Sequence, residues 1–191
     1  MRFNLPTHLT LLRIVLLPVL IVVFYLPWEG ANIACSIIFL VAAITDGLDG
    51  YLARKMEQAT AFGAFLDPVA DKLMVAVALV LIVQADPSPY LAIPAAVIIC
   101  REITIASLRE WMAEIGERGK VKVSWMGKVK TISQMIAITS LLYRDDLFLL
   151  ALPMQAIGYV FLYISVVLTL WSMAQYLQIA MPSLLKNRPH P

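Results

Sequence analysis

Long apolar stretches follow one another along almost the whole chain, and they leave few folds open to it. Each reaches about the 20 residues that an α-helix needs to cross a bilayer, once polar turns at one end are included. The stretches that predict helices are 9–28, 31–54, 61–85, 90–112, 129–144 and 148–178. Only 15% of the residues are charged, against about a quarter in an ordinary soluble domain. We therefore expect an all-α integral membrane protein with six transmembrane helices.

The length of the chain indicates one structural unit. Its 191 residues predict a single membrane domain over 1–191, with a frayed tail over 182–191. The first apolar run ends at Tyr25-Leu-Pro-Trp28, which is a poor signal-peptidase site, so we expect a retained first helix. A formal net charge of +2 is too small to indicate a nucleic-acid partner.

The polar ends of the predicted helices fall on one side of the membrane. If the N-terminus faces side A, then 14 of the 15 Lys and Arg residues lie on side A, and Arg144 lies on the other. The positive-inside rule makes side A the cytoplasm, and an even number of spans places both termini there. Polar residues a few turns inside each of the first five helices predict a polar cavity open to the cytosol and floored by apolar helix halves.

Aspartates within the apolar helices point to chemistry. A carboxylate among Leu, Val and Ala costs several kcal/mol unless a cation offsets the cost. The residues are Asp46, Asp49, Asp67 and Asp71. Spacings of three and four residues place each pair on one face of its helix, and antiparallel helices would bring the pairs opposite each other. Such a site suits two divalent cations ~3.5–4 Å apart. Oxygen ligands without nearby Cys or His favour Mg²⁺ or Mn²⁺ over zinc.

Small and basic residues accompany the aspartates. Gly50, Ala53 and Gly63 would let a substrate or a facing helix approach the backbone closely. Arg54 supplies a positive charge at the cytosolic mouth, where a diphosphate could be held.

These residues also have simpler interpretations. Gly50 and Gly63 could serve helix packing, and the neighbouring arginine could be an ordinary positive-inside residue. Asp46 could pair with Arg101 or Lys72. Packing alone does not explain the full set of aspartates at this spacing.

The spacing itself carries a resemblance. Between residues 46 and 71 the chain reads D-x2-D-G-x2-A-R-x8-G-x3-D-x3-D, which resembles the signature of the CDP-alcohol phosphotransferase family without departure. The similarity to bacterial members of the family continues in segments 4–13, 62–72, 101–102, 108–111 and 123–131. It covers most of the chain apart from the loops on the far side and the tail.

The resemblance implies an activity and a site. The hydroxyl of sn-glycerol 3-phosphate would attack the β-phosphorus of CDP-diacylglycerol and release CMP. Asp46, Asp49 and Asp67 would bind two divalent ions, and Asp71 would be both a metal neighbour and the general base. The residues expected along the cytidine diphosphate are Gly50, Ala53, Arg54 and Gly63. The resemblance also implies a bacterial cytoplasmic membrane, lipid contact and a homodimer.

The acceptor carries a phosphate, so its pocket should be basic. The main candidates are Arg101, Arg109, Lys128 and Lys130, and the secondary candidates are Lys122, Arg13 and Thr10. Lysines at these helix ends could instead extend toward lipid headgroups. Glu102 would orient its neighbour Arg101.

Two other functions remain open from the residues alone. A sister enzyme that uses inositol phosphate or serine as acceptor would share the whole aspartate motif. A divalent-cation transporter would also place carboxylates in the membrane, but it should present polar residues through the full bilayer thickness. The far halves of these helices are apolar, which disfavours transport.

Overall fold

The computed structural model describes residues 5–56, 61–117, 125–144 and 153–186. Within these ranges the side chains of 5, 6, 48–56, 61, 62, 64, 125, 126, 184 and 186 are left out of the description. The described residues form helices and short turns, which confirms the all-α class.

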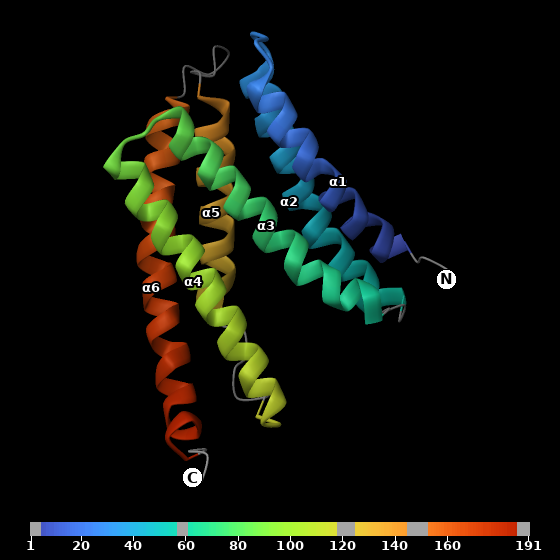
Figure 1. Ribbon diagram of the computed structural model, residues 1–191, viewed down its shortest axis with the longest axis vertical. Helices are drawn as coiled ribbons and strands as arrows, with labels where there is room; N and C mark the ends of the chain where they lie inside the picture. Colours follow the sequence, from blue (N-terminus) through green and yellow to red (C-terminus); the bar gives the residue numbers. More distant parts are fainter. Residues whose placement is uncertain (1–4, 57–60, 118–124, 145–152, 187–191) are drawn as a thin grey trace.

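The described chain forms six helices joined as a bundle (Figure 1). Their bounds are α1 Leu5–Tyr25, α2 Ala31–Met56, α3 Ala61–Ala85, α4 Pro89–Glu114, α5 Trp125–Tyr143 and α6 Met154–Lys186. Each overlaps one predicted apolar stretch, because apolar helices satisfy their own backbone hydrogen bonds wherever lipid or core replaces water.

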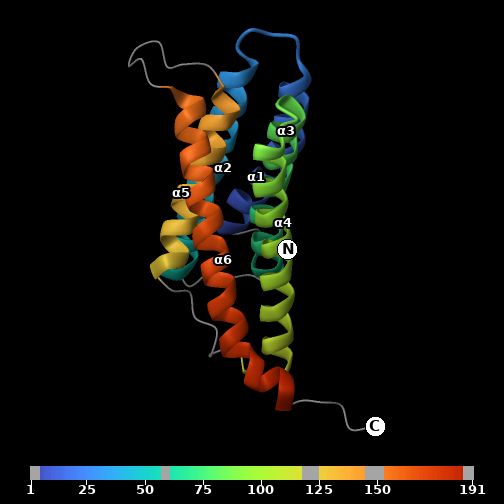
Figure 2. The same ribbon diagram turned by 90° about the vertical axis from the view of Figure 1, so that its left-hand side faces the viewer.

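The helices alternate in direction along the bundle. In Figure 1, α1 begins at about mid-height and runs to the upper end, and α6 ends at the lower end; the short turn after Tyr25 and the turn before Pro89 lie in the upper part. Figure 2 shows α4 and α6 side by side and reaching furthest at the lower end. The polar ends of α2, α3 and α4 therefore gather in the lower half of the bundle.

Capping residues set the bounds of α4. Ser88 accepts a hydrogen bond from the Tyr90 backbone N–H, and Pro89 occupies the first turn, where its missing N–H costs nothing. At the other end Gly116 adopts a φ of +76°, and the Glu117 N–H donates to the Met112 carbonyl over 2.8 Å. This glycine-terminated arrangement ends the helix two residues beyond the predicted 112, at Glu114.

The last helix ends later than the predicted 178, because α6 continues to Lys186. Tyr176 and Ala180 of α6 pack against Leu108 and Met112 of α4 in a small apolar cluster. Ser183 is buried and donates a hydrogen bond to Glu117. Packing on the extended end of α4 holds these last turns in a helix.

The main core fills the upper half of the bundle. Leu20, Phe39, Leu79 and Ile138 are almost completely buried, and they come from four different helices. Large apolar side chains also cover the outside, including Val22, Val80, Ile93, Ile132 and Val167. An apolar core with an equally apolar exterior is what a lipid environment requires.

Segments long and apolar enough to cross a membrane confirm the class of protein. Among the described residues they are Thr7–Tyr25, Pro89–Glu114 and Met154–Ser183, with Ala31–Gly47 as a shorter apolar helix. The chain is therefore a helical membrane protein. Charged residues of the polar half lie both in these spans, as Arg13 and Arg101 do, and in α2, α3 and α5.

A glycine lets α5 and α6 approach closely. A Cβ added at Gly158 would lie 2.6 Å from Leu141 Cγ and 3.2 Å from the Leu141 backbone nitrogen.

We expect Gly158→Ala to lower the free energy of unfolding by ~1–3 kcal/mol through overpacking. The fall should be seen as a lower apparent unfolding temperature in detergent. Gly47→Ala is the matched control, because a Cβ there meets nothing within 4 Å; equal shifts in both variants would contradict the close contact.

Candidate active site

Arg13 of α1 joins two of the aspartates. Its Nη1 donates to Asp46 of α2 and its Nη2 donates to Asp67 of α3, and both contacts are ion pairs. The Arg13 side chain is 1% exposed, whereas those of Asp46 and Asp67 are 32% and 42% exposed. A buried guanidinium thus bridges two carboxylates from neighbouring helices and offsets one of their two negative charges.

The partner of Asp46 differs from the two that the sequence suggests. Asp46 pairs with Arg13 rather than with Arg101 or Lys72. Arg13, a secondary candidate for the acceptor phosphate, lies against the aspartates. Thr10 is buried on the same helix, one turn earlier.

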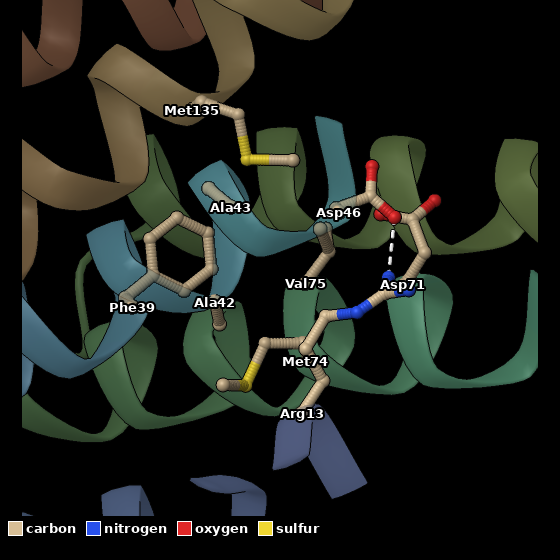
Figure 3. A pocket seen from close by; sticks show the side chains of 9 residues that line it. All are labelled: Arg13, Phe39, Ala42, Ala43, Asp46, Asp71, Met74, Val75 and Met135. Carbon is tan, nitrogen blue, oxygen red and sulfur yellow. Dashed lines mark hydrogen bonds and ion pairs between the residues drawn. The ribbon is translucent and has the colours of Figure 1, made fainter. Parts of the chain in front are cut away.

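Asp71 stands beside this ion-pair cluster. Figure 3 shows the side chains of Arg13, Asp46 and Asp71 meeting from three helices along one side of a small cavity. The cavity measures about 10 Å³, roughly the room that one water molecule needs. Phe39 and Met135 close its apolar side.

The donor set suits a hard cation, although it is incomplete in the described side chains. Among these side chains no group of three or more His, Cys, Asp or Glu residues is close enough to hold a metal ion. The side chain of the fourth predicted ligand, Asp49, lies outside the description. In the described part, the carboxylates of Asp46 and Asp67 both contact one cationic group, the guanidinium of Arg13. Carboxylates that already gather around a positive charge fit Mg²⁺ or Mn²⁺ better than a softer metal.

The residues predicted to line the cytidine diphosphate lie on the facing helices. Gly50, Ala53 and Arg54 belong to the last turns of α2, and their side chains lie outside the description. Gly63 lies in the first turn of α3 and is partly buried.

A second, basic cavity lies on the other side of Asp71. It measures about 230 Å³, below the ~300–1,000 Å³ of pockets for drug-sized ligands. Its charged lining comes from three helices: Asp71, Lys72, Arg101, Glu102, Arg109 and Lys130. Four positive groups against two negative ones leave a surplus of positive charge. Such a cavity suits a small anion.

Glu102 organises the cationic side chains of this basic cavity. It accepts a 3.0 Å hydrogen bond from Arg101 Nη1 and a second bond from Lys130 Nζ. Arg101 Nη2 also donates to the hydroxyl of Ser172 over 2.7 Å. The expectation that Glu102 orients Arg101 is confirmed. Both cations are held in place before any ligand arrives.

Sequence reasoning missed the contribution of α6. Tyr176 lines the basic cavity, and its hydroxyl accepts a 2.8 Å hydrogen bond from Arg109 Nη2. The sequence does contain a signal for it, a row of hydroxyl residues at helical spacing in a helix with no charged residue before Lys186. The row is Ser165, Thr169, Ser172 and Tyr176, and all four are buried. A polar stripe inside an apolar span marks the face that meets other polar groups.

The predicted acceptor residues therefore separate into groups. Arg101, Arg109 and Lys130 line the basic cavity. Lys128 is exposed and is not among the residues that line it. Lys122 lies outside the described residues.

The chain is similar to known proteins along almost its whole length. The family model described as CDP-alcohol phosphatidyltransferase matches residues 3–171. A protein of Haemophilus influenzae is 52% identical over 98% of this chain and 98% of its own length. A protein of Pectobacterium atrosepticum is 54% identical over 97% of this chain and all of its own length. Both relatives carry the name CDP-diacylglycerol–glycerol-3-phosphate 3-phosphatidyltransferase.

Removal of the Arg13 cation should destabilise the bundle. Arg13→Gln leaves Asp46 and Asp67 facing each other without their counter-charge. We expect a loss on the order of 2 kcal/mol, below the ~3–5 kcal/mol of a fully buried pair because both carboxylates are partly exposed. The measurement is the apparent unfolding temperature of metal-free protein in detergent. Lys128→Gln removes the same charge from an exposed site; an Arg13→Gln variant as stable as this control would disprove the bridge.

Proposed function

This chain belongs to the CDP-alcohol phosphatidyltransferase family, and we propose that it transfers the phosphatidyl group of CDP-diacylglycerol to sn-glycerol 3-phosphate. The products are phosphatidylglycerol phosphate and CMP. The shared name of the relatives supports both substrates. The observation that carries the proposal is the place of Asp71, which lines the cavity beside Asp46 and also the basic cavity.

Asp71 is the proposed general base. The acceptor hydroxyl forms a bond to the β-phosphorus, the bond from that phosphorus to the CMP oxygen breaks, and the hydroxyl proton passes to the Asp71 carboxylate. With the acceptor phosphate in the basic cavity, its hydroxyl end is directed toward the neighbouring carboxylate. The acceptor phosphate contacts come from Arg109, Lys130 and Arg101, with Lys128, Lys122, Arg13 and Thr10 as the remaining proposed residues.

The proposed metal ligands are Asp46, Asp49, Asp67 and Asp71. Mg²⁺ or Mn²⁺ bound there would neutralise the diphosphate and stabilise the charge on the departing CMP. The support from the structure is the all-oxygen donor set and the cation that Asp46 and Asp67 already share. Arg54 would bind the diphosphate, while Gly50, Ala53 and Gly63 leave room for the nucleotide.

We propose that the lipid tails of the donor leave the site between α2 and α5. A groove of about 460 Å³ lies between these helices and is lined mainly by apolar residues such as Leu40, Ile44 and Ile132. Asp46 and Gly47 also line it, so the groove extends from lipid-facing side chains to the aspartates. Diacyl chains in this groove would stay in lipid while the nucleotide reaches the polar half.

The membrane arrangement completes the proposal. All six helices would cross a bacterial cytoplasmic membrane, with both termini and the polar cavity on the cytosolic side and residues 1–191 as one domain. The alternating helix directions in Figure 1 support this topology. A homodimer is proposed from the family resemblance and from α6, which has no charged residue before Lys186 and on which Val160, Val167 and Trp171 are exposed.

Glycerol 3-phosphate is favoured over the other acceptors and over transport. Serine lacks a phosphate for the basic cavity, and inositol phosphate is the acceptor against which the enzyme should be compared directly. A cation transporter would need a polar route through the upper half, where the apolar core of Leu20, Phe39, Leu79 and Ile138 lies.

The first test is CMP release by purified protein. With CDP-diacylglycerol and Mg²⁺ we expect release that depends on glycerol 3-phosphate, and Asp71→Asn should lower it by about 10²-fold or more because a general base contributes ~10²–10⁴. Asp86→Asn is the matched control, since Asp86 is exposed in the turn at the far end and accepts a hydrogen bond from Tyr159. Release that required serine or inositol phosphate instead would overturn the acceptor. Full activity of Asp71→Asn would overturn the base.

Chelation tests the proposed ions. EDTA should abolish CMP release, and either Mg²⁺ or Mn²⁺ in excess should restore it, because carboxylate oxygens prefer hard cations. The same additions should raise the unfolding temperature of the wild type, since a ligand that binds only the folded state stabilises it. Asp67→Asn should reduce that rise. Undiminished CMP release in EDTA would contradict the metal site.

A further inference from the structure

Tyr176 of α6 contacts two arginines at the wall of the basic cavity. The guanidinium carbon of Arg109 lies 5.1 Å from the centre of the tyrosine ring, and that of Arg101 lies 5.9 Å from it. Both distances fall within the ~6 Å range of cation–π attraction. The Tyr176 hydroxyl also accepts the hydrogen bond from Arg109 Nη2. The residue is 7% exposed, so the tyrosine itself has a fixed place.

The two arginines differ in how they are held. Arg101 is buried, and its terminal nitrogens already bind Glu102 and Ser172. Arg109 is exposed, and the Tyr176 hydroxyl is the partner that the structure shows for its Nη2 atom. An exposed arginine has many rotamers, and ordering it on a ligand costs binding free energy. Tyr176 offsets that cost by ordering Arg109 beforehand.

The charges around the basic cavity indicate which ligand Arg109 is suited to bind. The charge of Glu102 is shared between Arg101 and Lys130, so those three residues together carry a single net positive charge. Lys72 directs its Nζ to the Pro68 carbonyl over 3.1 Å. A guanidinium with donors in a planar fork is suited to the oxygens of a phosphate.

From these contacts we propose that Tyr176 is a positioning residue that fixes Arg109 for the phosphate of the acceptor, and so selects phosphate-bearing acceptors. This inference rests on the proposed transfer to glycerol 3-phosphate. Tyr176 lies beyond residue 171, where the match to the family model ends. The two relatives named above match 97–98% of this chain, so their similarity extends past the end of the family model.

Tyr176→Phe provides the test, because it keeps the ring and removes the hydroxyl that binds Arg109. We expect the KM for glycerol 3-phosphate to rise about 3- to 10-fold, which corresponds to ~0.7–1.4 kcal/mol at 1.4 kcal/mol per factor of ten. The kcat and the KM for CDP-diacylglycerol should stay unchanged. The rate of CMP release with glycerol, which has no phosphate, should be the same in the variant as in the wild type. A merely structural role would alter all four values together.

A double-mutant cycle shows whether Tyr176 acts through Arg109. Arg109→Gln should raise the same KM more strongly, and the Arg109→Gln, Tyr176→Phe pair should match Arg109→Gln alone. Additive effects in the pair would overturn the proposal. Tyr163→Phe is the matched control. Tyr163 also lies on α6, but its hydroxyl donates to the backbone carbonyl of Tyr90 in α4 and not to a side chain of the basic cavity.

The outcomes separate this inference from the proposed function. Wild-type protein that releases no CMP with glycerol 3-phosphate would refute the proposed function itself. Active wild type with an unchanged KM in Tyr176→Phe would refute only the role of Tyr176. Unfolding temperatures for every variant exclude loss of folded protein as the cause of a raised KM.

Discussion

The polar half of this bundle depends on the contact of one buried guanidinium with two carboxylates. Arg13 brings α1 against Asp46 of α2 and Asp67 of α3, at the level where charged residues replace the apolar core. Without a cation between them, the two carboxylates would repel each other and disfavour the close approach of their helices. The packing of three helices and the geometry of the candidate site are therefore set by the same interaction.

The sequence predicted the elements better than their tertiary partners. Apolar length located every helix, because crossing a bilayer requires a minimum run of residues whatever the neighbours are. The end of α6 could not be found in this way, since Ser183 and Ala180 are held by contacts with α4 and its cap. The spacing of the aspartates correctly placed Asp46 and Asp67 on facing surfaces. Their partner Arg13 was missed because it lies 33 and 54 residues away in the chain.

The acceptor region shows a similar division. Arg101, Arg109 and Lys130 were identified from their positive charge at helix ends, and they line one cavity. Tyr176 was not predicted, because positive charge was the basis for the predicted pocket and α6 has no charged residue before Lys186. Its hydroxyl row repeats at helical spacing, so a search for buried polar periodicity would have identified this face. The hydroxyl groups on this apolar helix are the feature of the sequence that indicates which face of α6 contacts the basic cavity.

The apolar half of the bundle has a consequence for the leaflet in which the lipid product is released. Leu20, Phe39, Leu79 and Ile138 fill the half of the bundle opposite the aspartates. On the proposed membrane arrangement, substrate and product would meet the protein in a single leaflet, and a newly made anionic lipid would enter the leaflet from which its precursor came. Synthesis by such a fold would by itself make the two leaflets unequal. Movement of the lipid to the opposite leaflet would then need another process, after the product has left this fold.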